Sequence, residues 1–298
     1  GDRISITTAP KPESIAYIKK KLDGRILNSK EIDAIVRDIV NDDLSDIEMA
    51  YFTAAALIHK MTDKETIDLT RSIVKHGNKI QFKKGEIVAD KHCTGGVPGN
   101  RTTMLVVPIM AAAGIKMPKT SSRAITSPAG TADTMEVLAN VKNDAKKLKK
   151  IVEEVGAFIT WGGGVDLAAA DDKMIRVRFS LSLDPKGLLL SSIMAKKYAV
   201  GANHVLIDIP MGPDIKIKTM KQAEELKKDF QHIGKLLKMK ISVMVSDGSQ
   251  PIGNGIGPVL EAIDVLKVLN NDPTAPKDLR KKAIKMAAIL LELTKKAK

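Results

Sequence analysis

Apolar positions over residues 1–80 recur at spacings of three and four, as in Ile32, Ile35, Val36 and Val40. This spacing places them on one face of a helix. Three such stretches begin with Asn, Ser or Thr followed three residues later by Glu, a capping-box signal: Asn28/Glu31, Ser45/Glu48 and Thr62/Glu65. Gly77 is placed to end the last of these helices. The pattern predicts a small domain of antiparallel helices.

From Glu86 onward, short apolar runs alternate with helical patterns. The runs predict strands over residues 86–91, 115–122, 156–161, 204–210 and 240–247. Helices are expected at 101–114, 131–139 and 142–156, and after each of the last two strands. This alternation predicts a mostly parallel sheet covered by helices on both faces. Ligands of such sheets bind beyond the carboxyl ends of the strands, so we expect functional residues in the loops 91–100, 119–128, 162–171, 210–218 and 246–257.

Residues 171–199 read as helical on both sides of Pro185, a residue that ends or starts a helix. We expect these helices to return to the first domain. The predicted fold class is α/β, with a small all-helical domain and a larger α/β domain. The helical domain comprises residues 1–80 and helices from about 167–199, and the α/β domain comprises residues 81–166 and 200–298.

The composition limits which cellular compartment and which classes of partner are expected. The chain has 298 residues, a formal net charge of +13, 3% aromatic residues and one cysteine, Cys93. A single cysteine excludes an internal disulfide and indicates a reducing compartment, so we expect a cytoplasmic protein. No apolar run approaches the ~20 residues of a membrane helix, and the first ten residues lack the apolar centre of a signal peptide. The initial Gly1 indicates a processed or trimmed start.

The positive charge admits two interpretations, nucleic-acid binding or a Lys-rich surface with an anionic substrate. The lysines are scattered over most predicted helices, and almost no aromatic side chains lie among them to stack on bases. We therefore expect neither a nucleic-acid partner nor a membrane partner.

The stretch ADKHCTGGVPGNRTTM, residues 89–104, gathers the densest candidate chemistry. His92 and Cys93 are too few ligands for a zinc site, and the other histidines show no metal-ligand spacing. As a nucleophile and base they are poorly placed, because adjacent residues of an extended segment point to opposite sides. We expect no metal and no cofactor.

A phosphate cradle fits the whole stretch. Its three glycines allow backbone N–H groups to converge on an anion, its threonines add hydroxyls, Lys91 and Arg101 add charge, and a helix N-terminus follows. A structural glycine turn is the alternative. A second stretch, KTSSRAITSPAGT at residues 119–131, crowds hydroxyls around Arg123 after another predicted strand. Two such loops suggest two anionic groups bound near each other, although the second could be an ordinary polar loop.

Several motifs in order resemble thymidine and pyrimidine-nucleoside phosphorylases. These are ADKHCTGG, SSRAITSPAGTADTMEVL, DLAAADDKM, LSSIMAKKYA and SDGSQPIGNGIGPVLEAIDVL. Cys93 stands where those enzymes have Ser, and the second loop is rich in hydroxyls where theirs is rich in glycine. That combination resembles the archaeal AMP phosphorylase branch, and it implies phosphorolysis of AMP, or of CMP or UMP, to the free base and ribose 1,5-bisphosphate. The family's extra N-terminal and C-terminal domains are not recognised here, so the chain resembles the central catalytic portion, and a homodimer is implied.

The resemblance also implies roles for individual residues. The implied phosphate-binding residues are Lys91, Cys93, Gly95, Ser121 and Thr131. The implied AMP-binding residues are Gly96, Ser122, Arg123, Ala124, Ile125, Thr126, Ser127, Thr131, Ser192, Lys196 and Lys216. Either Arg176 or Arg178 lies near the position expected to read the base, and the choice is open.

Asp184 matches the proton donor of the family. A leaving purine needs a proton, and apolar neighbours such as Leu181, Leu183 and Leu188 would favour a neutral acid. From the residues alone, Asp184 is equally well placed to cap the helix after Pro185, and the resemblance favours the acid. Three other functions remain as alternatives: a pyrimidine-nucleoside or thymidine phosphorylase, an enzyme like anthranilate phosphoribosyltransferase, and a basic nucleic-acid-binding module.

Overall fold

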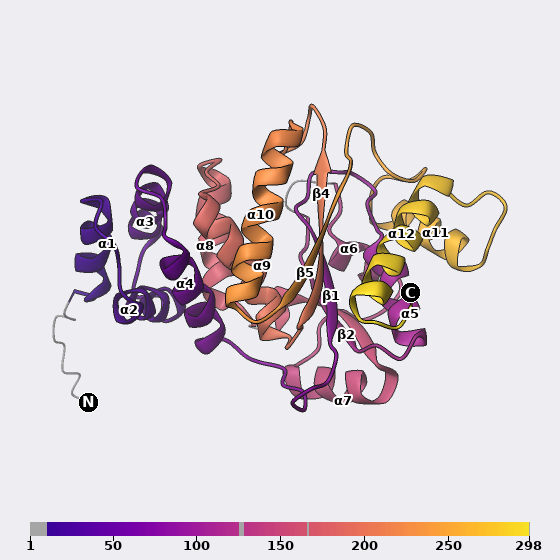
Figure 1. Ribbon diagram of the computed structural model, residues 1–298, viewed down its shortest axis with the longest axis horizontal. Coiled ribbons are helices and arrows are strands. Elements are labelled where there is room, and N and C mark those ends of the chain that lie inside the picture. The colour runs from indigo at the N-terminus through magenta and orange to yellow at the C-terminus, as the bar shows by residue number, and fades with distance from the viewer. Residues whose placement is uncertain (1–10, 125–127, 166, 298) are drawn as a thin grey trace, which may run out of the picture. The chain divides into compact units, whose positions relative to one another are not determined.

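A computed structural model describes residues 11–124, 128–165 and 167–297 (Figure 1). The chain forms two compact units. The helical unit is made of Gly1–His76 and Ala169–Ser192, and the α/β unit of Gly77–Ala168 and Ile193–Lys298, within the described residues. A helical domain and an α/β domain were both predicted, and this fold class is confirmed.

The helical unit contains α1 (Ser14–Leu22), α2 (Ser29–Val40), α3 (Asp46–Ile58), α4 (Asp63–Lys75), α8 (Ala169–Ser180) and the first part of α9 (Lys186–Ala199). All three predicted helix starts are confirmed. In each, the glutamate carboxylate accepts a hydrogen bond from the backbone N–H of the cap residue, at 2.8 Å for Asn28, 2.6 Å for Ser45 and 2.8 Å for Thr62. These bonds satisfy backbone donors that a helix start leaves free.

All pairings between the named strands of the α/β unit are parallel. β1 (Ala89–Cys93), β4 (His204–Met211) and β5 (Lys240–Asp247) form one sheet in the order β1-β4-β5, and β2 (Met117–Ser121) pairs with β3 (Ala157–Trp161). The predicted strands are confirmed, with ends that shift by up to three residues. The parallel pairing brings the carboxyl end of β1 beside β4, where Cys93 is in register with Asp208.

One isolated bridge, between Val88 and Lys116, joins the β1 side of the unit to the β2 side. The N–H of Ala89 donates to the carbonyl of Lys116 at 2.8 Å. The next bond of a parallel ladder would come from the N–H of residue 118, but Pro118 has no N–H. The N–H of Lys91 donates instead to Asp90 Oδ1 at 2.7 Å. The ladder therefore stops after one bridge, and β1 and β2 lie in separate sheets.

Helices of the α/β unit pack on these strands and on one another. They are α5 (Thr103–Ala112), α6 (Thr131–Glu136), α7 (Ala145–Val155), α10 (Met220–Leu236), α11 (Pro258–Leu269), α12 (Lys277–Leu293) and a 3₁₀ turn at Gly162–Gly164. Figure 1 shows α10 on one side of β4 and β5, with α5 and α12 on the other, as expected for a parallel sheet. Within the described part of the chain, no helix combines the length and apolar character needed to span a membrane.

The boundary of the α/β unit differs in detail from the prediction, which placed residues up to 199 with the helical domain. The second part of α9, from Ile193, belongs to the α/β unit. Lys197 on this part ion-pairs with the buried Asp90 of β1 at 2.5 Å, and the N–H of Ile80 donates to Ala199 O at 2.9 Å. Polar contacts with β1 and with the segment before it therefore tie this end of α9 to the α/β unit.

Candidate functional site

The glycine-rich stretch forms a turn directly after β1. The N–H of Thr94 donates to the carbonyl of Asp208 at 3.0 Å, which extends the pairing with β4 by one residue. Gly95 and Gly96 then adopt φ values of 96° and 97°, a conformation that side-chain-bearing residues rarely adopt. The turn therefore lies at the carboxyl end of a parallel strand, where ligands of such sheets bind.

Lys91, the middle residue of β1, is buried. Its Nζ donates to Thr102 Oγ1 at 2.6 Å, and Thr102 in turn lies 3.4 Å from Asn100 Oδ1. The Asn100 amide donates to Cys93 Sγ at 3.3 Å. Lys91 and Cys93, both predicted to bind phosphate, thus lie in one hydrogen-bonded set.

Burial shifts the pKa values of Lys91 and Cys93 in this set. It lowers the pKa of Lys91 to about 8 and raises the pKa of the Cys93 thiol to about 11, because each charged form loses hydration. Cys93 is therefore a neutral thiol at physiological pH, and Lys91 keeps most of its charge there. Loss of hydration also leaves the Lys91 ammonium ready to gain from a bound anion.

A second group of cations lies around Asp90 on β1. Asp90 is buried, ion-pairs with Lys197 at 2.5 Å and lies 4.0 Å from Lys119 Nζ on β2. Burial, and then the charge of Lys197, holds the pKa of Lys119 well below its usual value. Burial and the surrounding lysines likewise lower the pKa of His92, which is neutral at physiological pH.

Asp208 on β4 pairs with a further cation that the sequence did not suggest. Its Oδ1 accepts from Ser246 Oγ at 2.6 Å, and its Oδ2 lies 3.0 Å from Lys282 Nζ on α12. The charge of Lys282 contributes to the lowered pKa of Lys91, so the two ammonium groups share one environment. No motif marked Lys282, which belongs to a helix near the end of the chain.

The second hydroxyl-rich stretch, residues 119–131, starts inside β2, which ends at Ser121, and continues through the exposed Ser122 and Ala124. Arg123 pairs with Asp133 at 2.8 Å and with Glu136 at 2.6 Å. The predicted residues Ile125, Thr126 and Ser127 lie outside the described residues.

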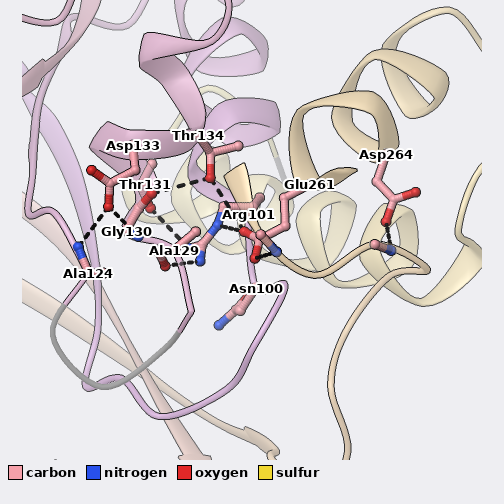
Figure 2. Close-up of polar contacts among 12 residues, drawn as sticks. Asn100, Arg101, Ala124, Ala129, Gly130, Thr131, Asp133, Thr134, Glu261 and Asp264 are labelled. Atoms are coloured by element: carbon pink, nitrogen blue, oxygen red, sulfur yellow. Dashed lines mark hydrogen bonds and ion pairs between the residues drawn. The ribbon is translucent and has the colours of Figure 1, made fainter. Parts of the chain in front are cut away.

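Close backbone packing at Gly130 brings the end of this second stretch back to its start. A side chain at Gly130 would place its Cβ 2.3 Å from the backbone carbon of Arg123 and 2.5 Å from Ser122 O. The Asp133 carboxylate accepts from the N–H groups of Ala124, at 2.7 Å, and Gly130, at 2.9 Å (Figure 2). The two ends of the stretch are therefore held together, and α6 starts with Thr131 at this closure.

Arg101 does not lie in the cradle as expected. Its side chain is buried, ion-pairs with Glu261 on α11 and donates to the carbonyl of Ala129 (Figure 2). The correction has a physical reason, because a buried guanidinium needs a carboxylate partner and Glu261 supplies it. Arg101 therefore holds the ends of loops together and is not free to meet an anion.

The remaining predicted residues of the α/β unit are more open. Lys196 on α9 is half-buried, and Lys216 is exposed in the loop after β4. Ile215, which precedes Lys216, packs closely on Gly96. A Cβ atom added at Gly96 would lie 3.0 Å from Ile215 Cγ2. The loop of Lys216 is thus in contact with the glycine turn.

Two other predicted residues, Asp184 and Ser192, belong to the helical unit and are linked there. Ser192 Oγ donates to Asp171 Oδ2 at 2.8 Å, and Asp171 Oδ1 lies 3.8 Å from Arg178. Arg178 also donates to Asp184 Oδ1 at 3.3 Å. Asp171 and Arg178 therefore connect the predicted acid to the predicted nucleotide contact.

The surroundings of Asp184 are more polar than the sequence suggested. Its side chain is 34% exposed beside the guanidinium of Arg178, and Leu181 is 46% exposed. The buried Leu188 is the part of the expected apolar environment that is present. The other candidate for reading the base, Arg176, is exposed and pairs with Asp46 at 2.7 Å. Among the described residues, no group of three or more His, Cys, Asp or Glu side chains could hold a metal ion.

Family models match both units. A model described as "Glycosyl transferase family, helical bundle domain" matches residues 15–77, and one described as "Glycosyl transferase family, a/b domain" matches residues 85–277. The chain belongs to this glycosyl transferase family. The two matched domains correspond to the helical and α/β units, and the second match contains both hydroxyl-rich stretches.

Relatives of this chain carry two kinds of name. It is 46% identical over 293 residues to a protein named AMP phosphorylase from Methanococcus vannielii, which confirms the resemblance to that branch. It is 47% identical over 292 residues to a putative thymidine phosphorylase from Cupriavidus necator. These alignments cover 98% of the chain but 58% and 56% of the two relatives. The chain thus spans little more than half the length of these relatives.

A solved structure shares the fold of this chain. Anthranilate phosphoribosyltransferase from Thermus thermophilus superposes with a TM-score of 0.74 over 94% of the chain and 89% of that protein, at 16% identity. At this identity the likeness concerns the fold alone.

Proposed function

We propose that this glycosyl transferase transfers a pentosyl group from a nucleoside 5′-monophosphate to inorganic phosphate, with AMP as the substrate. The buried ammonium of Lys91 beside Thr102, on the strand that leads into the Gly95–Gly96 turn, is the observation that carries the proposal. A cation and hydroxyls at a strand end, next to backbone N–H groups, suit an oxyanion. The AMP phosphorylase name of a 46% identical relative supports the substrate.

The chemistry follows from the charges. An oxygen of inorganic phosphate bonds to C1′ of the ribose while the C1′–N bond breaks, and the bonding electrons leave with the base. The sugar carries positive charge in the transition state, which the attacking phosphate stabilises when donors hold it in place. The leaving base takes up a proton, for which Asp184 is the proposed donor. Because AMP already carries a 5′-phosphate, the sugar product is ribose 1,5-bisphosphate.

In this proposal Lys91, Cys93, Gly95, Ser121 and Thr131 bind the attacking phosphate. The nucleotide is assigned to Gly96, the stretch from Ser122 to Ser127, Thr131, Ser192, Lys196 and Lys216. A homodimer in the cytoplasm completes the proposal, and light scattering on the purified protein tests the dimer.

The deciding experiment incubates the protein with AMP, CMP, UMP or thymidine, each with and without phosphate, and separates the free base by chromatography. Phosphate-dependent release of adenine from AMP is the expected result. Base release without phosphate, or none from any monophosphate, would contradict the proposal.

The second candidate is a thymidine phosphorylase, because the Cupriavidus necator relative with that name is 47% identical. Phosphate-dependent release of thymine from thymidine, with no release from AMP, would select it. Two further alternatives need assays of their own: an anthranilate phosphoribosyltransferase-like enzyme would consume a ribosyl pyrophosphate, and a nucleic-acid-binding module would give salt-sensitive binding with no turnover.

A further inference from the structure

Arg101 joins three segments of the α/β unit that are far apart in the sequence. It follows the glycine-rich turn and is 5% exposed. Its Nε pairs with Glu261 on α11, its Nη2 donates to Ala129 O, and its Nη1 donates to Thr131 Oγ1 at 3.4 Å (Figure 2). One guanidinium thus contacts the end of the second hydroxyl-rich stretch, the start of α6 and α11.

Glu261 is as fully engaged as its partner. It is 1% exposed, and its Oε2 also accepts from Thr134 Oγ1 on α6 at 3.4 Å. Its Oε1 accepts from the N–H of Gly257 at 3.1 Å, before the first turn of its own helix. Both carboxylate oxygens are therefore used, and the pair connects α6 to α11.

Stability alone does not account for such a pair. Removing two charges from water costs much of what their attraction returns, and well-packed apolar residues often stabilise a core equally well. A planar guanidinium with a carboxylate instead holds several acceptors in fixed directions. The donors of Arg101 therefore determine the orientation of Ala129 and Thr131.

The hydrogen bond from Arg101 orients the Thr131 hydroxyl. Its oxygen accepts from Arg101, so its own proton is left to donate elsewhere. Thr131 is one of the residues assigned to phosphate in the proposed function. A hydroxyl that must donate to an anion works best when a fixed cation occupies its acceptor side.

We propose that Arg101 and Glu261 are a positioning pair that orients the Thr131 hydroxyl for phosphate without touching the phosphate themselves. The inference rests on the proposed function for the identity of the anion. It assigns Arg101 to a role different from that of Lys91, although both are cations of the same glycine-rich stretch.

The test compares Glu261→Gln with wild type in the phosphorolysis assay. Glutamine keeps the shape and loses the charge, so we expect KM for phosphate to rise about tenfold. Thr131 is also assigned to the nucleotide, but many other residues share that role, so KM for the nucleotide should rise by a smaller factor. An equal change in both KM values, or none, would overturn the positioning role. If Glu261→Gln does not fold, the double variant Arg101→Gln/Glu261→Gln serves in its place, because it leaves no single charge buried.

A double-mutant cycle shows whether the pair acts through Thr131. We expect Arg101→Lys and Thr131→Val each to raise KM for phosphate, and the two together to raise it no more than Thr131→Val alone. Additive effects would mean that the pair acts elsewhere, and would overturn the proposal.

Asp264→Asn is the matched control. Asp264 lies on the same helix and is 5% exposed, and its Oδ2 accepts from the N–H groups of Asn254 at 2.7 Å and Gly255 at 2.8 Å. The Asp264→Asn substitution therefore removes a buried charge from α11 at a residue that does not touch Thr131 or Ala129. We expect a similar drop in melting temperature and an unchanged ratio of the two KM values; a tenfold rise in KM for phosphate alone would overturn the specific role of the pair.

A binding measurement separates this inference from the proposed function. Inorganic phosphate alone is expected to raise the melting temperature of the wild type, and to raise that of Glu261→Gln less. If the wild type responds to phosphate but never releases a base, the proposed function fails and the thermal shifts still test the pair. If the wild type does not respond to phosphate at all, both are overturned.

Discussion

The ammonium of Lys91 lies 2.6 Å from the hydroxyl of Thr102, and both groups are buried at the carboxyl end of β1. An ammonium in this position has lost most of its hydration and finds a neutral hydroxyl in place of a direct carboxylate bond. Its pKa of about 8 expresses that loss. A dianion placed beside it would restore the missing stabilisation, which gives the site a measurable dependence on pH.

Phosphate use is expected to weaken above pH 8. Lys91 loses its proton there, whereas inorganic phosphate stays a dianion, so KM for phosphate should rise by up to about tenfold per pH unit. Steady-state assays over the alkaline range measure this. Lys91→Arg keeps its charge and should remove the rise, and a flat wild-type profile above pH 8 would contradict the role of Lys91.

The same shift predicts the sign of a stability effect. Between pH 8 and the ordinary lysine value of 10.5, the unfolded chain holds the Lys91 proton more tightly than the folded chain. The contribution of Lys91 to the free energy of unfolding therefore rises with pH over this window. The denaturation midpoint of the wild type should therefore rise relative to that of Lys91→Met as pH increases from 8 to 10.5.

Cys93→Ser should keep phosphorolysis within about threefold of wild type. Burial raises the pKa of the thiol to about 11, so it serves as a small neutral polar group, and Asn100 can donate to a hydroxyl equally well. A loss of a hundredfold or more would instead indicate a nucleophile. Alkylation by iodoacetamide at pH 8 should be slow in the folded protein and fast after unfolding, and rapid alkylation of the folded protein would contradict the neutral thiol.

Asp184→Asn should lower kcat by about a hundredfold and change the affinity for AMP much less, because proton donation matters in the transition state. Asp23→Asn is the control. Asp23 pairs with an arginine of the same unit, Arg25, at 3.3 Å, and neither residue carries a proposed role. If Asp184→Asn weakens AMP binding at unchanged kcat, Asp184 is a binding residue or a helix cap.

Gly130→Ala should abolish phosphate use and lower the melting temperature. Its Cβ would meet backbone atoms of residues 122–124 at 2.3 to 2.6 Å, which no rotamer change can relieve. Gly162→Ala is the control, because its Cβ would make ordinary contacts with Thr120 at 3.7 Å and Ser121 at 3.9 Å. Equal effects of the two substitutions would show that the close packing at Gly130 is unimportant.

Local patterns in the sequence were enough for the elements of the fold. The capping boxes before α2, α3 and α4 specify where these helices begin, because the bonds involved span three residues. The glycine-rich stretch was recognised because its turn depends on its own residue types. Strand ends were less well predicted; β1 runs to Cys93, since pairing with β4 extends it beyond the apolar run.

Partners distant in the sequence could not be predicted. Glu261 lies 160 residues after Arg101, and no spacing rule connects them, so Arg101 was expected to add its charge to the phosphate cradle. Lys282 was missed for the same reason, because only the packing of α12 brings it to Asp208. The polar surroundings of Asp184 likewise depend on how Arg178 of α8 turns toward it.

The proline in β2 has a consequence for how such an enzyme can change over evolution. Since the ladder between β1 and β2 stops at Pro118, no continuous register ties Lys91 to Lys119, and the carboxylate of Asp90 bridges the gap in place of backbone bonds. Each hydroxyl-rich stretch is therefore anchored on its own sheet. Under the proposed function, a small shift of one sheet would alter the spacing between the two anions without unpairing any strand, so that substrate size could change while Lys91 stays in place on β1.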